Sequence, residues 1–254
     1  MTKPVYIKGI RLGEGIPRIC VPVVGENRAE ILEQAREAVR AGADLVEWRM
    51  DYWKEEDKKK YLEEILFALD SILSDKPLLF TIRTCREGGL FSESDEEYEI
   101  LCMIAAASGK ADLVDVEVFS SPKGRVELVQ KLRSRGVRVA ASSHDCQKTD
   151  SQEELISRLR KMDRTGADIL KLAVMAQGFE DAARLMKAVS LMREETDKPL
   201  IAMAMGEHGM ITRIAGEDYG SCVSFGTVGN PSAPGQLPAG ELRSLMEALH
   251  RKKI

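Results

Sequence analysis

The stretch "TGADILKLAVMAQ", residues 165–177, marks the change from an expected helix to an expected buried strand. The segment that leads into it, "EELISRLRKMDRTG" (153–166), ends in basic residues and a glycine, as helices commonly do. The apolar run that follows is typical of a strand covered on both faces. The pair Ala-Asp that opens this run also stands at 43–44 and 111–112, again after a helix-like segment. The stretch therefore indicates one unit of a repeating helix–strand pattern.

Further strands of this kind are expected along the chain, separated by amphipathic helical segments. The expected strands are 18–25, 43–51, 77–84, 111–119, 137–145, 167–176, 199–206 and 221–228. Strands that alternate with helices indicate parallel pairing, and eight such units can close into an α/β fold of the (β/α)8 TIM barrel type, commonly about 250 residues long. No linker or change of composition divides the chain, so residues 1–254 are predicted to form a single domain. The opening "VYIKGIRLGEG" (5–15) lies outside the repeat and is predicted to be a hairpin that closes the bottom of the barrel.

Composition and charge argue against several classes of function. The net charge is −4, so no global field favours nucleic acid or an anionic membrane as a partner. No apolar run reaches the roughly 18 residues of a membrane span, and "MTKPVYIKGI" lacks the apolar centre of a signal peptide. The five cysteines form no CxxC pair, which is typical of reduced thiols in a cytoplasmic protein. The three histidines form no HxxxH pattern, so no metal site is predicted.

Ionisable side chains occur on the expected strands with a consistent alternation. Because successive residues of a strand point to opposite faces, Glu47 and Arg49 share one face, and Arg83, His144 and Lys171 follow the same rule on their own strands. Each lies toward the C-terminal end of its strand, where barrel enzymes carry their chemistry. The alternative is a structural layer of ion pairs inside the barrel, with His144 as a satisfied core histidine.

Lys171 interrupts an otherwise apolar run. An ammonium buried without compensation costs several kcal/mol, so burial near the cations Arg49 and Arg83 is expected to lower its pKa. A neutral amine near pH 7 can attack a ketone and form a Schiff base. A structural lysine paired with Glu47 is the alternative.

Two further segments carry polar groups near the ends of the last expected strands. Arg213 in "MGEHGMITRIAG" (205–216) is placed one turn into a helix, where it could bind a carboxylate through two parallel hydrogen bonds. The loop "GTVGNPSAPGQLPAG" (226–240) has the length and composition of a lid, with Ser232 and Gln236 as hydrogen-bonding groups. A solvated arginine and a surface linker are the alternatives.

A set of short motifs runs through the chain in a fixed order. The motifs are "EWRMD" (47–51), "TIRTCREGG" (81–89), "SSHD" (142–145), "KLAVMA" (171–176), "MAM" (203–205), "ITRIAG" (211–216) and "SAPGQ" (232–236). Together they resemble type I 3-dehydroquinate dehydratase, the Schiff-base dehydratase of the shikimate pathway. The resemblance spans nearly the whole chain, and the set is much more specific than any one motif.

The resemblance implies a role for each matching residue. Lys171 corresponds to the lysine that forms an imine with the C3 ketone of 3-dehydroquinate. His144 corresponds to the general acid–base that removes a C2 proton and helps expel the C1 hydroxyl, and Glu87 to the carboxylate that orients it. The implied substrate-binding residues are Arg213 for the carboxylate, Glu47, Arg49 and Arg83 for the ring, Met203, Met205 and Phe225 for the apolar walls, and Ser232 and Gln236 for the closing loop.

The same resemblance implies an enzyme that needs no cofactor, because the protonated imine is itself the electron sink. It also implies the small molecule 3-dehydroquinate as the substrate and a homodimer as the assembly. The chain departs from the family's pattern at Pro22, where many members have a serine, and at Cys146, where an aromatic residue is frequent.

Two other functions remain as alternatives. One is another Schiff-base barrel lyase, such as an aldolase for phosphorylated sugars, because glycine-bearing loops follow the last two expected strands. The other is a ligand-sensing relative without catalysis, which would be expected to lack Lys171 or His144.

Overall fold

The structure is a computed structural model that describes residues 2–55, 57–121, 124–229 and 232–250. Its centre is an eight-stranded sheet with neighbours in the order β10-β3-β4-β5-β6-β7-β8-β9, and each neighbouring pair is parallel. The strands are β3 Arg18–Val23, β4 Leu45–Arg49, β5 Leu78–Thr81, β6 Leu113–Glu117, β7 Arg138–Asp145, β8 Ile169–Met175, β9 Leu200–Met205 and β10 Val223–Phe225. Each lies within a stretch that the sequence predicts as a strand.

The two ends of this sheet meet at a seam between β9 and β10. An isolated parallel bridge joins Leu200 to Ser221. At the same seam Cys222 N donates to Leu200 O at 2.8 Å, and Ala202 N donates to Ser221 Oγ at 3.0 Å. These bonds complete a nearly closed barrel, so the predicted (β/α)8 fold is confirmed.

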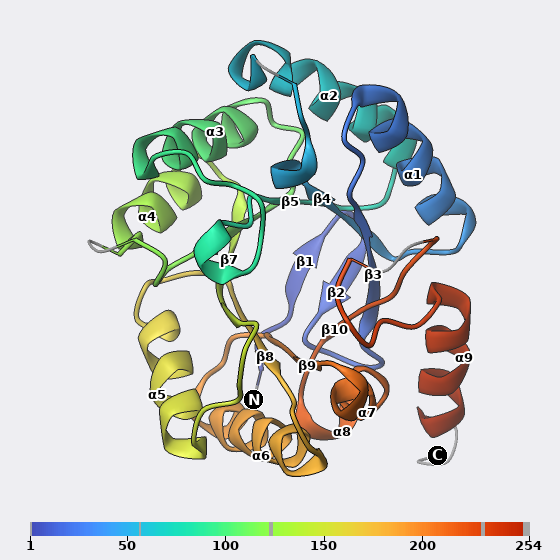
Figure 1. Cartoon of the computed structure of the whole chain (residues 1–254), viewed down its shortest axis with the longest axis vertical. Helices are drawn as coiled ribbons and strands as arrows, with labels where there is room; N and C mark the ends of the chain where they lie inside the picture. The colour runs from blue at the N-terminus through green and yellow to red at the C-terminus, as the bar shows by residue number, and fades with distance from the viewer. Residues whose placement is uncertain (1, 56, 122–123, 230–231, 251–254) are drawn as a thin grey trace.

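Helices surround the strands as an outer ring (Figure 1). They are α1 Arg28–Arg40, α2 Lys58–Leu73, α3 Asp95–Ala107, α4 Val126–Ser134, α5 Gln152–Asp163, α6 Phe179–Glu195, α7 Met210–Ile214, α8 Gly216–Tyr219 and α9 Ala239–His250.

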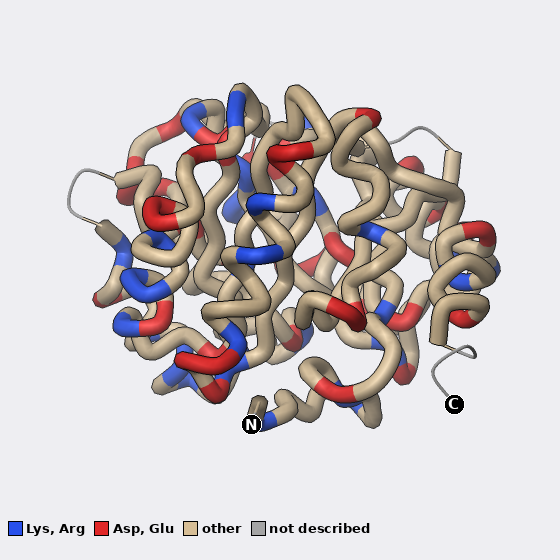
Figure 2. Tube along the Cα trace, turned by 90° about the horizontal axis from the view of Figure 1, so that it is seen from below, with Lys and Arg blue, Asp and Glu red and all other residues tan. Residues whose placement is uncertain are grey.

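Acidic and basic residues are intermixed along the chain (Figure 2). Within the described ranges, no helix combines the length and apolar character that a membrane span requires.

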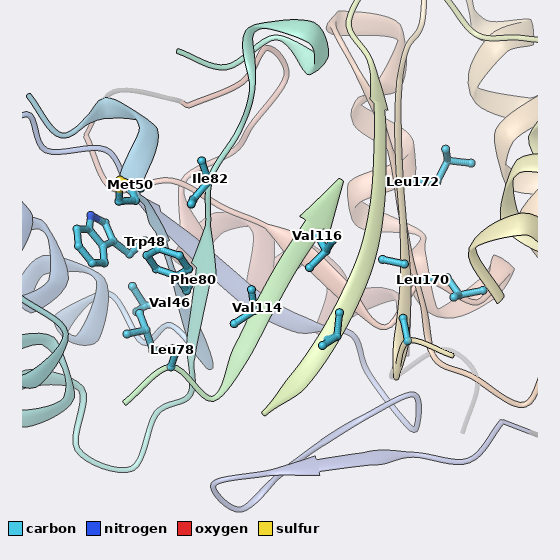
Figure 3. Packing of buried hydrophobic residues seen from close by; sticks show 14 of the residues in the cluster. Val46, Trp48, Met50, Leu78, Phe80, Ile82, Val114, Val116, Leu170 and Leu172 are labelled. Carbon is cyan, nitrogen blue, oxygen red and sulfur yellow. The ribbon is translucent and has the colours of Figure 1, made fainter. Parts of the chain in front are cut away.

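The main hydrophobic core lies between the strands and the helices. The strand side chains that build it are apolar and point away from the barrel axis, toward the helices (Figure 3). Trp48 of β4 packs edge-on against Phe80 of β5, with ring centroids 5.7 Å apart, and Trp48 also contacts Trp53. Each fully buried large apolar side chain contributes about 1.5–3 kcal/mol. This layer holds the barrel together, so the strand positions that face the barrel axis are free to carry other side chains.

A hairpin of β1 Val5–Ile7 and β2 Ile10–Leu12 lies against the N-terminal end of the barrel (Figure 1). Its two-residue turn has positive φ at Lys8 (40°) and Gly9 (80°), as a type I′ hairpin turn requires. Ile7 and Leu12 are buried in a cluster with inward-facing residues of the barrel strands. The predicted hairpin therefore covers the bottom of the barrel.

The recurring Ala-Asp pair has a structural purpose at the same end. In each copy the aspartate exchanges two hydrogen bonds with a residue at the start of a preceding barrel strand. The pairs are Asp44 with Ile19, Asp112 with Leu78 and Asp168 with Val139, with side-chain bonds of 2.7, 2.8 and 3.0 Å. Each aspartate thus satisfies a backbone N–H at the N-terminal end of a barrel strand and helps to set the strand register.

Inward-facing residues form layers of different character along the barrel axis. The layer nearest the hairpin is apolar: Cys20, Leu45, Leu79, Leu113, Ile169 and Ile201. Two residues further along the same strands the inward side chains include Glu47, Thr81, Asp115 and Lys171, all buried. The change from apolar to charged therefore happens within one step of the strand alternation.

Candidate active site

A cavity of about 140 Å³ lies at the C-terminal ends of the strands. Every residue that the sequence predicts for the site lines it. These residues are Glu47 and Arg49 of β4, Arg83 and Glu87 after β5, His144 of β7, Lys171 of β8, Met203 and Met205 of β9, Arg213 of α7, Phe225 of β10, and Ser232 and Gln236 of the following loop. The structure therefore brings the whole predicted set together at one mouth of the barrel.

Lys171 is buried and held by two carboxylates. Its Nζ donates to Glu47 Oε1 at 2.9 Å and to Asp115 Oδ2 at 2.8 Å. It also lies 4.8 Å from the centroid of the Phe225 ring. Burial would lower the pKa of Lys171, but Asp115 and Glu47 outweigh it and raise the pKa above its ordinary value. Lys171 is therefore an ammonium at neutral pH.

The prediction that burial and nearby cations lower the pKa of Lys171 was wrong. Arg49 and Arg83 do line the cavity, but protein carboxylates neutralise them. Arg49 is bound by both oxygens of Asp51 at 2.8 Å each. Arg83 donates to Glu117 at 2.9 Å and to Asp115 at 3.1 Å. The net field at Lys171 is therefore set by carboxylates.

His144 and Glu87 form a hydrogen-bonded pair. Glu87 lies in the short 3-10 helix η2 Cys85–Glu87, which follows the end of β5 at Thr81 after three intervening residues. Glu87 Oε2 is 2.8 Å from His144 Nδ1 and accepts from the backbone N of His144 at 2.9 Å. Two contacts to one carboxylate oxygen fix both the strand end and the imidazole ring, and leave Nε2 as the ring's free acid–base atom.

The proton affinities of this pair move in opposite directions. Burial, and then Arg83 and Lys171, hold the pKa of His144 well below its ordinary value. Burial and the charge of Glu117 raise the pKa of Glu87 to about 8. The pKa of His144 is lowered because the site desolvates the ring among cations. The imidazole is therefore neutral near pH 7 and able to accept a proton.

Arg213 is buried without a carboxylate partner. Its Nη2 donates to Pro234 O at 3.1 Å. Nε and Nη1 find no hydrogen-bond partner anywhere in the part of the chain that the structure describes. Burial lowers the pKa of this guanidinium to about 10. A buried cation with two unused donors beside a cavity is suited to an anionic ligand group.

The loop after β10 folds over the cavity and is held by its own side chains. Gln236 Oε1 accepts from Ser232 N at 2.8 Å, and Gln236 Nε2 donates to Ser232 Oγ at 3.0 Å. Pro234 O accepts from Gly206 N at 3.2 Å. At Gly235, where φ is +78°, a Cβ would come within 2.5 Å of Gly206 O. The loop thus approaches the end of β9 so closely that a glycine is required.

Three buried carboxylates of the site were missed by the sequence reasoning. Asp115 and Glu117 lie on the inward parity of β6, and Asp51 follows β4. The signal was present, because "ADLVDVEVF" (111–119) shows the same alternation that points to Glu47 and Arg49. The same rule applied to this strand would have found the partner of Lys171.

The two departures from the family's pattern lie in different places. Pro22 is buried in β3 opposite Glu47 in the strand register and is not one of the described residues that line the cavity. Cys146 does line the cavity, and its Sγ donates to Glu87 O at 3.5 Å. Cys146 is therefore part of the wall beside the His144–Glu87 pair.

Comparison with known proteins agrees with this geometry. The sequence pattern of type I 3-dehydroquinase matches residues 19–253. The chain belongs to the type I 3-dehydroquinase family. It is 41% identical over 252 residues to the 3-dehydroquinate dehydratase of Bacillus licheniformis, which covers 99% of both chains.

Solved structures of this family superpose closely on the barrel. The type I 3-dehydroquinate dehydratase of Clostridium difficile is 39% identical, with a TM-score of 0.94 and coverage of 99% of this chain and 100% of that one. The 3-dehydroquinate dehydratase of Geobacillus kaustophilus is 36% identical, with a TM-score of 0.95 and coverage of 99% and 98%. A 3-hexulose-6-phosphate synthase, at 18% identity and a TM-score of 0.61, shares the fold alone.

Proposed function

We propose that this chain converts 3-dehydroquinate to 3-dehydroshikimate and water through an imine on Lys171, with His144 as the proton carrier. The observation that carries the proposal is the meeting of three groups in one cavity: an amine, a histidine–carboxylate pair and an unpaired guanidinium. The activity of the family's named members supports 3-dehydroquinate as the substrate, and the cavity offers each of its reacting groups a partner.

Arg213 supports the carboxylate end of this assignment. Its buried charge has no carboxylate partner among the described residues. A substrate carboxylate would supply the missing charge and accept two parallel hydrogen bonds from Nε and a terminal nitrogen. The substrate is therefore held by its carboxylate, with its ring against Phe225 and Met203.

Lys171 has to lose a proton before its nitrogen can attack. Burial would raise the pKa of Asp115, but Arg83 and Lys171 hold it well below its ordinary range, so Asp115 is a poor acceptor. The neutral His144 accepts the proton instead and returns it to the carbinolamine hydroxyl, which leaves as water. The cationic imine that results is a Schiff base stabilised by the same two carboxylates that hold the ammonium.

The elimination then uses the same histidine twice. His144 removes a proton from C2, and the electron pair moves into the imine to give an enamine. The enamine expels the C1 hydroxyl, which leaves as water with the proton from His144, and a second water hydrolyses the imine. Glu87 keeps the imidazole oriented through both transfers.

Borohydride trapping tests the proposal. Incubation with 3-dehydroquinate and borohydride should leave a reduced adduct on Lys171, seen by peptide mass spectrometry, while the enone product appears in the near ultraviolet. Lys171→Met should abolish both signals. Lys131→Met is the matched control, because Lys131 is an exposed lysine of α4. An adduct on another lysine, or enone formation by Lys171→Met, would contradict the imine.

Other parts of the assignment are expected to follow the family. We propose a single catalytic domain over residues 1–254, a homodimer and a cytoplasmic location.

A further inference from the structure

Glu117 is a buried carboxylate at the end of β6 that does not line the cavity but binds Arg83, which does, and the adjacent Thr84. Its Oε1 accepts from Arg83 Nη1 at 2.9 Å and from Thr84 N at 2.8 Å. Its Oε2 accepts from Thr84 Oγ1 at 2.6 Å. Thr84 is the N-cap residue immediately before η2, and η2 carries Glu87. The carboxylate of Glu117 therefore accepts three hydrogen bonds, and the two from Thr84 fix the start of the turn that presents Glu87 to His144.

Glu117 and Glu87 also compete for one cation. Arg83 Nη1 lies 2.9 Å from Glu117 Oε1 and 3.7 Å from Glu87 Oε2. A neighbouring negative charge raises the proton affinity of a carboxylate, and the shorter contact to Arg83 belongs to Glu117. Consistent with this, the charge of Glu117 is a main reason, after burial, why the pKa of Glu87 is raised.

Behind Glu117 lies a second arginine, Arg125, which is almost fully buried. Its Nη1 donates to Glu117 O at 2.9 Å and lies 3.9 Å from Glu117 Oε2, and its guanidinium stacks 3.7 Å from the centre of the Tyr98 ring. Its other terminal nitrogen binds Asp95 at 3.0 Å. Arg125 therefore holds Glu117 in place through its main-chain oxygen and lies beside its carboxylate.

We propose that Glu117 is a positioning residue of the reaction: it sets the proton affinity of the Glu87–His144 pair through Arg83 and through the turn that begins at Thr84. The inference rests on the proposed function, in which His144 carries the protons. In this role Glu117 keeps a proton within the Glu87–His144 pair. The imidazole is then neutral before it accepts a proton, and the pair stabilises the imidazolium that forms.

Several other charged or titratable groups face the pair, and they also contribute to its pH dependence. On the cavity side they are Arg49, Arg83, Asp115, Cys146 and Lys171, and on the outer side Arg86, Asp145, Asp150, Glu154, Arg158 and Lys161. Glu117 differs from the outer groups in being fully buried and in sharing Arg83 Nη1 with Glu87. Solvent screens the exposed groups much more strongly.

The test is the pH dependence of kcat in Glu117→Gln. The amide keeps the size of the side chain and an oxygen for Arg83 and Thr84 N, while the hydroxyl of Thr84 can turn to accept from the new NH₂. Loss of the negative charge frees Arg83 to pair more strongly with Glu87 and lowers the proton affinity of the pair. The acid limb of the profile should therefore move to lower pH by about one unit, as expected for one charge a few ångströms away.

Two further variants separate charge from loosened structure. Asp95→Asn removes a carboxylate from the far side of Arg125, where it is partly exposed and does not touch Arg83, so the acid limb should stay at the wild-type pH. Arg125→Met removes the cation behind Glu117, and the acid limb should move to higher pH. Opposite shifts in two variants are not produced by general disorder of the site.

A Glu117→Gln enzyme with a wild-type pH profile would overturn the inference, even if kcat fell, because a merely structural role lowers the rate without moving the limb. Circular dichroism shows whether each variant is folded. If Glu117→Gln does not fold, Arg125→Met decides: a limb at higher pH supports the inference and an unmoved limb refutes it. Failure of the proposed function looks different, because the wild-type enzyme itself would then make no enone.

Discussion

The two ends of the barrel interior use the same strands in opposite ways. Near the hairpin the inward residues are apolar, and Asp44, Asp112 and Asp168 bind backbone N–H groups at the N-terminal ends of the strands. Two residues further along, the inward residues are charged, and their carboxylates bind other side chains. Removing a group from the first end should therefore affect folding, and removing one from the second should affect chemistry.

The charged end is itself of two kinds. Lys171, Arg49 and Arg83 each have carboxylate partners at hydrogen-bonding distance, so their burial is compensated within the protein. Arg213 has no such partner in the described ranges. Compensated charges should support both stability and catalysis, whereas the uncompensated one should support ligand binding at a cost to stability.

Lys171→Met should have the largest effect, because it changes chemistry and stability together. Without the amine no imine can form, so enone production should fall below detection. Asp115 and Glu47 would lose a shared cation, and breaking a buried pair typically costs about 3–5 kcal/mol of unfolding free energy. Urea denaturation of the variant and of Lys131→Met measures this cost, and the control should stay within about 0.5 kcal/mol of wild type.

The pH dependence of that cost has a defined sign. The folded-state pKa of Lys171 is raised, so its contribution to stability is complete below the unfolded pKa and is lost only as the pH rises through the folded pKa. At neutral pH the wild-type protein therefore has the whole benefit. In Lys171→Met the orphaned carboxylates can take up protons, so the difference from wild type should be smaller at pH 5 than at pH 8. A cost independent of pH would argue that packing, not charge, had been lost.

His144→Ala should follow, with a fall in kcat of about 10²–10⁴-fold for the loss of general acid–base catalysis. The two contacts that Glu87 makes to His144 include one to its backbone, so the strand end should stay in place. Borohydride should still trap an adduct on Lys171, formed more slowly, while the enone nearly disappears. Near-normal enone production would assign the proton transfers to another group.

Arg213→Met should have the next largest effect. It distinguishes charges that are paired within the protein from the unpaired charge of Arg213. Substrate binding should weaken by about 2–5 kcal/mol, seen as a raised KM, because the carboxylate loses its partner. The unfolding free energy without ligand should not fall. The folded-state pKa of Arg213 is lowered to about 10, which means that folding disfavours its charged form at neutral pH. Arg213→Lys should recover part of the binding, because it keeps the charge without the planar fork. A large loss of stability in Arg213→Met would show that the guanidinium is paired within the protein.

Sequence reasoning succeeded where the answer depends on local periodicity. The alternation of "EWR" and "LKL" placed Glu47, Arg49 and Lys171 inside the barrel, and the helix–strand repeat predicted the closure that brings them together. Glu87 lies outside a strand, so only the family resemblance pointed to it.

It failed where the answer depends on distances between separate strands. The sign of the Lys171 pKa shift is set by Asp115, which is 56 positions away in the sequence and 2.8 Å away in space. The unpaired state of Arg213 was equally out of reach, because it depends on what every other segment leaves uncovered. Such features follow from the assembled barrel and have no local signature.

Asp44→Ala should have the smallest effect on activity and completes the comparison from the apolar end. The side chain of Asp44 accepts from Ile19 N at 2.7 Å and from Arg243 at 3.0 Å, far along β3 and β4 from the cavity. Its loss leaves a buried backbone N–H without its acceptor, which costs about 1–3 kcal/mol. The unfolding free energy should fall by that amount, while kcat and KM at 25 °C stay at wild-type values. Because the register of β3 and β4 is also held by their own ladder bonds, the charged layer should keep its geometry. A changed kcat in a fully folded Asp44→Ala would mean that the two ends are coupled along the strands, and the division between a folding end and a chemical end would fail.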